Sequence, residues 1–143
     1  METKHKAMIV KPQDLRLGNL ILHELFGAVE VIAIYKNSYD VTRDGKTKEW
    51  FTGLGCKGIA LTEEWMLKAG FEIRESLSYK EYFIGTNEIT HDWLFSLTLI
   101  KNPERIDAIN APFYNNGRHT VQYVHQLQNI YFALTGKELE FKL

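Results

Sequence analysis

The stretch from Thr120 to Gly136 constrains the fold most, because it has the clearest helical pattern in the chain. Thr120 is predicted as the N-cap, and Gly136 as the residue that follows the last turn. Apolar residues recur at helical spacing along one side of this stretch, with two more flanking them. They are Val124, Leu127, Tyr131 and Leu134, flanked by Tyr123 and Ile130. This side predicts a helix packed on a core, with Leu127 at its centre.

The opposite side of the same predicted helix is polar but carries no permanent charge. It presents Gln122, His125, Gln126 and Asn129. These side chains form hydrogen bonds without the Glu and Lys residues that are ordinary on a solvated helix face, so they are our candidate binding residues. A purely solvated helix side is the alternative reading, and the sequence leaves both open.

The N-terminal part of the chain predicts a series of short strands separated by tight turns. The most regular of them is rich in β-branched residues and alternates Val29, Val31 and Ala33 with Glu30, Ile32 and Ile34. The predicted strands are Asp14 to Leu22, Gly27 to Tyr35, Tyr39 to Thr42 and Thr47 to Phe51, with a hairpin turn at Asp44-Gly45. The first of them contains an irregularity at Gly18-Asn19, which favours a bulge or a turn there. They predict a small antiparallel barrel-like or curled sheet, and such a meander can close into an SH3-like barrel.

The second part of the chain changes character at Leu61. A short helix is predicted from Thr62 to Ala69, with Thr62 as its N-cap and Gly70 as its end. Further antiparallel strands are predicted at Phe71 to Arg74, Tyr79 to Ile84 and Trp93 to Ile100, with a final edge strand at Leu139 to Leu143. The fold class is therefore α+β, in one domain over 1–143 with a barrel-like β subregion at 14–60 and an α+β subregion at 61–143.

Charge is distributed unevenly along the 143 residues. Residues 1–60 hold 9 Lys and Arg against 7 Asp and Glu, whereas residues 61–143 hold 8 against 11, so the net charges are +2 and −3. The positive half favours nucleic-acid binding as a second hypothesis, because phosphate contacts need Lys or Arg and bases stack on aromatic rings. The candidate residues for that face are Lys46, Lys48, Trp50 and Lys57.

Residues that suggest a nucleotide-binding loop or a metal site lack the spacing or the surrounding elements that such sites need. Glycines at 53, 55 and 58 match the letters of a dinucleotide-binding loop, but no helix is predicted where the phosphate would need one. The five histidines are scattered without the spacing of a zinc site. We therefore predict no metal, no cofactor and no catalytic residues.

The chain also shows no sign of export or membrane insertion. Cys56 is the only cysteine, so no internal disulfide is possible. The apolar run after the charged N-terminus breaks at Lys11-Pro12, which is too short for a signal peptide or a membrane span. These observations predict a cytoplasmic protein without a membrane partner.

Two blocks of the sequence are distinctive. They are L-T-E-E-W-M-L-K-A-G-F from Leu61 and Y-V-H-Q-L-Q-N-I-Y-F-A-L-T-G-K-E-L from Tyr123. They resemble a family of small uncharacterised proteins from prophage and other mobile regions of gut bacteria, and Asp14 to Asn19 is similar to the opening of the same family. The resemblance covers most of the chain and implies a bacterial, phage-derived protein. It implies no activity, cofactor or site.

The leading hypothesis from the sequence is a non-enzymatic interaction module that binds another protein or a second copy of itself. The uncharged polar helix side and the absence of a catalytic constellation favour it. The alternative is a nucleic-acid-binding accessory protein that uses the N-terminal sheet.

Overall fold

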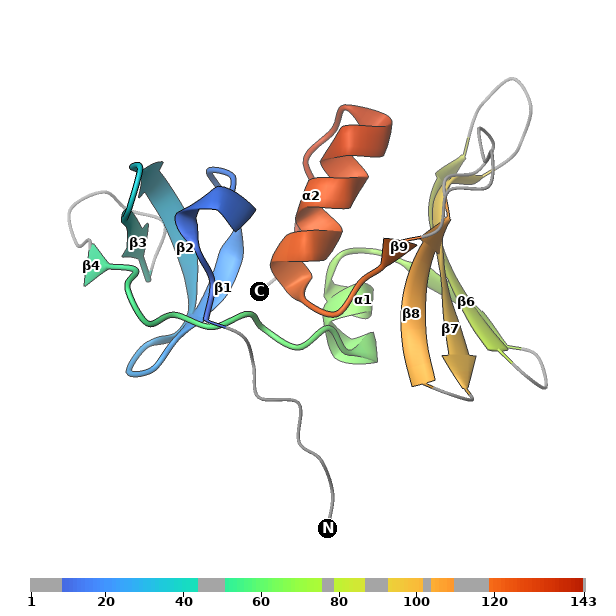
Figure 1. The fold of residues 1–143 in the computed structure, drawn as a ribbon. Helices are drawn as coiled ribbons and strands as arrows, with labels where there is room; N and C mark the ends of the chain where they lie inside the picture. The colour runs from blue at the N-terminus through green and yellow to red at the C-terminus, as the bar shows by residue number, and fades with distance from the viewer. Residues whose placement is uncertain are drawn as a thin grey trace, which may run out of the picture. The chain divides into compact units, whose positions relative to one another are not determined.

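The computed structural model describes residues 9–43, 51–75, 79–86, 93–101, 104–109 and 119–142 (Figure 1). The chain divides into two units. Unit 1 contains Met1–Ala60 and Tyr123–His125, and unit 2 contains Leu61–Gln122 and Gln126–Leu143. Both units are built on antiparallel sheets and a C-terminal helix follows them in the chain, which confirms the predicted α+β class. That the units act as one domain over 1–143 stays a prediction.

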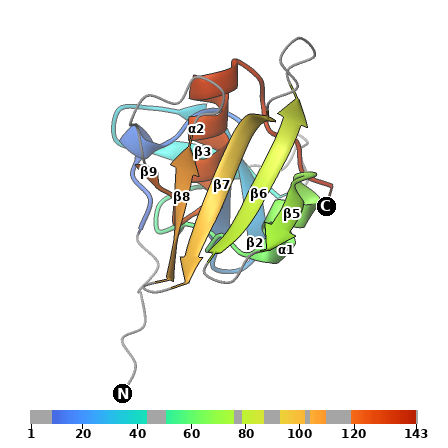
Figure 2. The same ribbon diagram turned by 90° about the vertical axis from the view of Figure 1, so that its right-hand side faces the viewer.

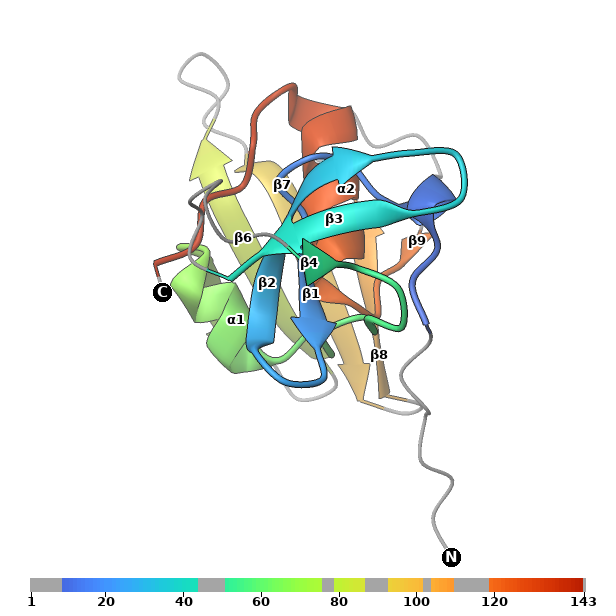
Figure 3. The same ribbon diagram turned by 90° about the vertical axis from the view of Figure 1, so that its left-hand side faces the viewer.

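Unit 1 is a four-stranded antiparallel meander with the order β1-β2-β3-β4 (Figure 3). Its strands are β1 (Leu20–His23), β2 (Gly27–Ile34), β3 (Tyr39–Thr42) and β4 (Phe51–Thr52), preceded by the short 3-10 helix η1 (Pro12–Asp14). Predicted strands at β2 and β3 are confirmed, and the Asp44-Gly45 hairpin turn lies outside the described residues. The sheet is curled and does not close into a barrel.

The core of unit 1 comes from the inward side of this sheet. Val29, Val31 and Val41 are fully or almost fully buried, as the alternation predicts for β2. A β-bulge between Val31 and Ala33 then shifts the alternation by one residue. As a result Ile34, rather than Ala33, packs against the core.

The predicted first strand, Asp14 to Leu22, begins only at Leu20, because the predicted irregularity at Gly18-Asn19 is a turn. Gly18 has φ +90°, a conformation that favours glycine, and it forms a turn instead of a strand. Asn19 is buried and its side-chain oxygen accepts a hydrogen bond from the Arg16 backbone N–H at 2.7 Å. This local bond stabilises the turn, so pairing begins only at Leu20.

Unit 2 begins with the helix α1 (Glu63–Lys68), which has the predicted ends. The Thr62 hydroxyl accepts a hydrogen bond from the Trp65 N–H at 3.4 Å. Gly70 takes φ +90° after the helix, and the Phe71 N–H reaches back to the Met66 carbonyl at 3.1 Å. Met66 and Phe71 are both buried in the core of unit 2.

The sheet of unit 2 is a five-stranded antiparallel meander with the order β5-β6-β7-β8-β9. Its strands are β5 (Glu72–Glu75), β6 (Tyr79–Thr86), β7 (Trp93–Lys101), β8 (Glu104–Ile109) and β9 (His119–Thr120). Figure 2 shows β5 to β8 side by side, with α2 (Val124–Thr135) behind them. The first three strands were predicted from the sequence, whereas β8 and β9 were not.

The long helix is confirmed, but its predicted start is wrong. Thr120 belongs to β9, where it pairs with Asp107, and residues 121–123 separate it from the helix, so it cannot be the N-cap. The helix starts at Val124 and is followed by Gly136 at φ +75°, as predicted. Leu127 is fully buried at its centre, and Tyr131 lies in the same core.

The predicted edge strand from Leu139 to Leu143 is also wrong for the residues described. Residues 139–142 form no strand. Leu139 is buried and Phe141 packs against the core, while the Lys142 N–H donates to the Lys68 carbonyl at 2.8 Å. This backbone hydrogen bond to the end of α1 stands in place of the strand pairing that was expected.

Candidate protein-interaction surface

A row of outward-facing side chains crosses the curled sheet of unit 1. Lys57 pairs with Leu22 through two backbone hydrogen bonds, of 2.8 and 3.0 Å, and it also pairs with Ile9. Leu22 in turn pairs with Ala28 across β1 and β2. Directly opposed residues of antiparallel segments place their side chains on the same face. Ile9, Lys57, Leu22 and Ala28 therefore form one line, which we call the cross-strand row.

The cross-strand row is apolar, exposed and charged only at its centre. Ile9 is 58 % exposed and Leu22 is 41 % exposed, and Lys57 is exposed between them. The alternate residues, among them Cys56 and Ile21, point into the core and are buried. The row thus lies on the outer side of a well-packed sheet. In the isolated chain, its apolar side chains contact solvent.

Lys57 gives this surface its electrostatic character. Within the described parts of the chain no carboxylate forms an ion pair with it. Its long aliphatic stem can lie along Ile9 and Leu22 while the ammonium stays in water. The arrangement offers one cation framed by aliphatic side chains.

The predicted polar face of the long helix does not form one surface. Gln122 is exposed, and its backbone N–H donates to the side-chain oxygen of Gln126 at 2.9 Å. Gln126 and Asn129 are half-buried, and both take part in further contacts. His125 is only 5 % exposed and belongs to unit 1, whereas the other three residues belong to unit 2. Gln126 therefore acts locally as a cap for the start of the helix.

His125 is held in unit 1 by close packing. Its ring stacks on Tyr123 with centroids 5.7 Å apart, and a Cβ on Gly58 would lie 2.6 Å from the Tyr123 ring. Its Nδ1 is buried without a hydrogen-bond partner among the described residues. Burial lowers the pKa of His125, although the charge of Asp14 opposes this change. The side chain is therefore a neutral packing residue.

The glycines at 53, 55 and 58 have structural roles of their own. A Cβ on Gly53 would lie 2.0 Å from the ring of Tyr39, and a Cβ on Gly58 would lie 2.6 Å from the ring of Tyr123. Gly55 takes φ +87°. Close packing and one left-handed turn account for the three positions, and no helix begins at this loop.

The residues proposed for nucleic-acid binding are mostly outside the described structure. Lys46, Lys48 and Trp50 lie there, and only Lys57 is placed. An aromatic cluster that the sequence did not reveal lies in unit 1. The Phe26 ring stacks on His23 with centroids 4.7 Å apart and packs at a tilt against Phe51 with centroids 4.5 Å apart, and the Arg43 guanidinium lies 5.1 Å from the Phe26 ring. These rings are half-buried against the core, so they stabilise the sheet.

Other kinds of site find no support in the described residues. No group of three or more His, Cys, Asp and Glu there could hold a metal ion. Cys56 is buried, and burial raises its pKa to about 11, so its nucleophilic thiolate is scarce near neutral pH. Across the same residues, each helix is too short or too polar to cross a membrane.

Comparisons with protein-family models, with curated proteins and with solved structures found no match to this chain.

Proposed function

We propose that the protein is a non-enzymatic interaction module whose cross-strand row binds another protein. The observation that supports this proposal is the exposure of Ile9 and Leu22 on either side of Lys57. Exposed apolar side chains grouped around a charge on a packed sheet favour a protein-interaction site. The partner surface has apolar side chains around a carboxylate, which pairs with Lys57.

The cross-strand row resembles the central part of a protein–protein interface, with aliphatic side chains around one charged group. Aliphatic side chains around a charge exclude water from it when a partner covers them, and a charge pair in that setting fixes the orientation of the partner. Leu22 and Ala28 lie on β1 and β2, whose other side forms the core of unit 1, and Ile9 and Lys57 are held beside them by backbone pairing. The partner therefore meets a surface that is already formed.

The test compares captured proteins between the original chain and Lys57→Glu. The two sequence blocks resemble proteins from mobile regions of gut bacteria, so the lysate comes from such a bacterium. Each captured protein is purified, and its affinity is measured by titration calorimetry. We expect Lys57→Glu to weaken a specific partner at least about tenfold, or 1.4 kcal/mol, because the new carboxylate repels the partner's own. Leu22→Ser is expected to weaken the same partner.

Matched controls come from exposed positions of the same unit. Lys36→Glu makes the same change of charge away from the row, and Leu54→Ser makes the same change of polarity. Neither control should alter the affinity. Partners that bind the Lys57→Glu and Lys36→Glu variants equally well would refute the proposal.

Nucleic acid and a second copy of the chain are the competing occupants, and both are measured directly. Nuclease treatment before capture, followed by a gel shift at low salt, detects nucleic-acid binding. Light scattering over a range of concentrations detects self-association. A salt-sensitive gel shift that Lys57→Glu abolishes, with no protein partner captured, would replace the proposed function with the nucleic-acid hypothesis.

A further inference from the structure

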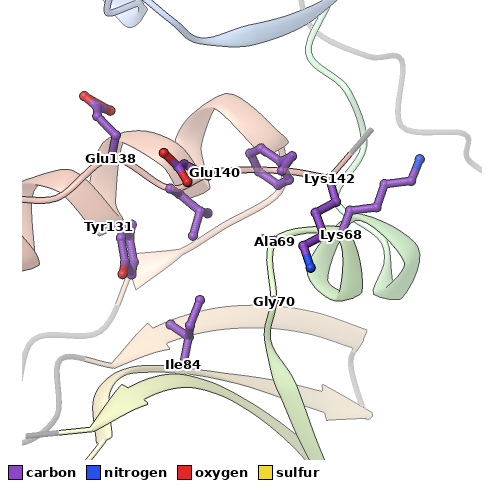
Figure 4. A pocket seen from close by; sticks show the side chains of 10 residues that line it. Lys68, Ala69, Gly70, Ile84, Tyr131, Glu138, Glu140 and Lys142 are labelled. Atoms are coloured by element: carbon purple, nitrogen blue, oxygen red, sulfur yellow. The ribbon is translucent and has the colours of Figure 1, made fainter.

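Unit 2 has an open pocket of about 400 Å³, which Figure 4 shows against the end of α1 and the C-terminal segment. Glu138, Glu140 and Lys142 line it from that segment, and all three are exposed, whereas Leu139 is buried. Their charged groups therefore lie on the solvent side of the segment, opposite Leu139. The segment turns apolar side chains inward, and an apolar surface alone does not select one ligand.

A buried imidazole in unit 1, by contrast, has a ring nitrogen without a partner. Across the part of the chain that the structure describes, His125 Nδ1 is the one buried side-chain nitrogen or oxygen with no hydrogen bond. A buried polar atom without a partner costs free energy. The charged imidazole carries an N–H on both nitrogens, so protonation adds a buried charge and leaves a donor at Nδ1 without an acceptor. The folded segment therefore disfavours the charged ring.

The His125 ring has little room to turn toward an acceptor. It stacks on the Tyr123 ring, with centroids 5.7 Å apart and planes 14° from parallel, and it is only 5 % exposed. On another side, a Cβ on Gly58 would lie 3.2 Å from His125 Cε1, so the glycine backbone closes the space. A charged ring can therefore reach water only if the segment that carries it moves.

The segment Tyr123–His125 is attached to unit 1 by little backbone pairing. The Val124 N–H donates to the Ile59 carbonyl at 2.9 Å, and Tyr123 forms an isolated antiparallel bridge with Ala60 outside the named strands. By comparison, β1 and β2 pair at four positions. The rest of α2 belongs to unit 2, so this segment is the last part of unit 1 in the chain. Burial of the Tyr123 and Val124 side chains keeps the segment in place at neutral pH.

We propose that mild acid releases Tyr123–His125 locally from unit 1, while the sheet of that unit stays folded. Release brings the imidazole into water, where it binds a proton. Asp14 of η1 is the described charged group that acts on this ring, and its carboxylate favours the charged form and so moderates the release. Lys57, next to Gly58, is exposed on the outer side of the sheet. The segment is thus a pH-sensitive switch within the chain alone, and it does not depend on the proposed function.

Native-state hydrogen exchange of the full chain, followed by NMR at pH 7.5 and 5.5 in low urea, tests the release. The probes are the amides of Val124 and of Val31, which is buried in the sheet and donates to the Asn19 carbonyl at 2.9 Å. Local release exposes little surface, so exchange at Val124 should be insensitive to urea, whereas exchange at Val31 should follow unfolding of the sheet. The protection factor of Val124 should fall between the two pH values by up to about tenfold, because the released ring, with a pKa of about 6.5, takes up one proton.

Two results would overturn the proposal. One is a Val124 protection factor that is equal at both pH values. The other is exchange at Val124 with the same urea dependence as at Val31, since the segment would then open only together with the sheet.

Single substitutions assign the pH dependence to His125. His125→Phe keeps an aromatic ring beside Tyr123 but cannot be charged, so its Val124 protection factor should be equal at both pH values. His125→Gln is also uncharged and should give the same result. Asp14→Asn should bring the fall closer to about tenfold, because the charge that favours imidazolium is removed. His23→Gln, at a half-buried position of the same unit, is the matched control and should keep the fall. A fall that persists in both His125 variants would contradict the proposal.

Discussion

Unit 1 and unit 2 both rest on antiparallel meanders, but they fill their cores from different sources. In unit 2, helices cover the sheet, and the core depends on large side chains such as Met66 and Leu127. In unit 1, the sheet curls around its own β-branched residues and Tyr39, and a loop closes over that ring. The missing side chain of Gly53 is as necessary there as Leu127 is in unit 2. A glycine pattern that looks like a ligand loop can therefore be a packing requirement.

The largest expected effect comes from emptying the core of unit 2. Leu127 is 0 % exposed, so Leu127→Ala should lower the free energy of unfolding by about 2–5 kcal/mol. Urea denaturation measures the loss, and hydrogen exchange locates it in unit 2. Leu67→Ala is the control, because that leucine is 53 % exposed on α1. Similar losses from both variants would show that the helices do not provide the core of this unit.

Filling the space at Gly53 is the corresponding change in unit 1. Gly53→Ala should lower the free energy of unfolding by about 1–3 kcal/mol, because the new Cβ collides with the Tyr39 ring. Cys56 reports the opening of unit 1, since its buried thiol reacts only when the unit opens. We therefore expect faster labelling of Cys56 by a thiol reagent at pH 8.

The neighbouring residue supplies the control for this change. Leu54 is exposed, so Leu54→Ala should leave the labelling rate almost unaltered. The Leu127→Ala variant then sharpens the comparison. Fast labelling of Cys56 in that variant would mean that the two units unfold together, as a single domain over 1–143 predicts.

A smaller effect is expected from the hydroxyl of Tyr39. It donates a buried hydrogen bond to the Val10 carbonyl at 3.0 Å. Tyr39→Phe should cost about 1 kcal/mol in urea denaturation, because that carbonyl loses its partner. Tyr35→Phe is matched to it, since the Tyr35 hydroxyl bonds Asp40 at the surface. If the two variants are equally stable, the buried bond does not hold the N-terminal segment to the sheet.

The smallest effect is a pH dependence from His125 in unit 1. Its pKa in the folded chain is lowered, so the folded state favours neutral imidazole. The stability from this group is present above the unfolded pKa of about 6.5 and is lost as the pH falls toward the folded pKa. Because the unfolded imidazole is half protonated at pH 6.5, the loss between pH 6.5 and 5.5 stays below about 1 kcal/mol.

Urea denaturation at pH 7.5 and 5.5 measures this dependence. His125→Gln should reduce the difference between the two pH values, whereas His23→Gln, at a half-buried position of the same unit, should retain it. An unchanged difference in His125→Gln would assign the pH dependence to other groups.

Much of the fold was predictable because local patterns and tertiary structure agree. The alternation in β2, the Thr62 cap and the glycine after α2 each follow from a few adjacent residues. The strand β8 was not predicted because Glu104, Arg105 and Asp107 interrupt its apolar pattern. Its extended conformation comes from antiparallel pairing with β7, which its own sequence pattern does not indicate.

The candidate surface was far less predictable than the fold. Only Lys57 was named from the sequence, as part of a different site. The cross-strand row exists because backbone pairing brings Ile9 and Lys57, which are far apart in the chain, beside Leu22 and Ala28. By contrast, the helix face around Gln126 was visible in the sequence, but Gln126 bonds the backbone at the start of the helix and His125 is buried within unit 1. Helical periodicity showed which residues share one side of the helix. It could not show which other residues of the chain cover that side.

Unit 1 is discontinuous in the chain, and this has a consequence for biosynthesis. The Val124 N–H bonds the Ile59 carbonyl at 2.9 Å, and Tyr123 packs on Gly58. A ribosome makes residues 61–122 before it makes these two partners. Unit 1 therefore cannot finish folding when its first 60 residues emerge, and it must wait until most of unit 2 has been synthesised. A chain stopped at Ala60 therefore lacks the segment, Tyr123–His125, that completes its first unit.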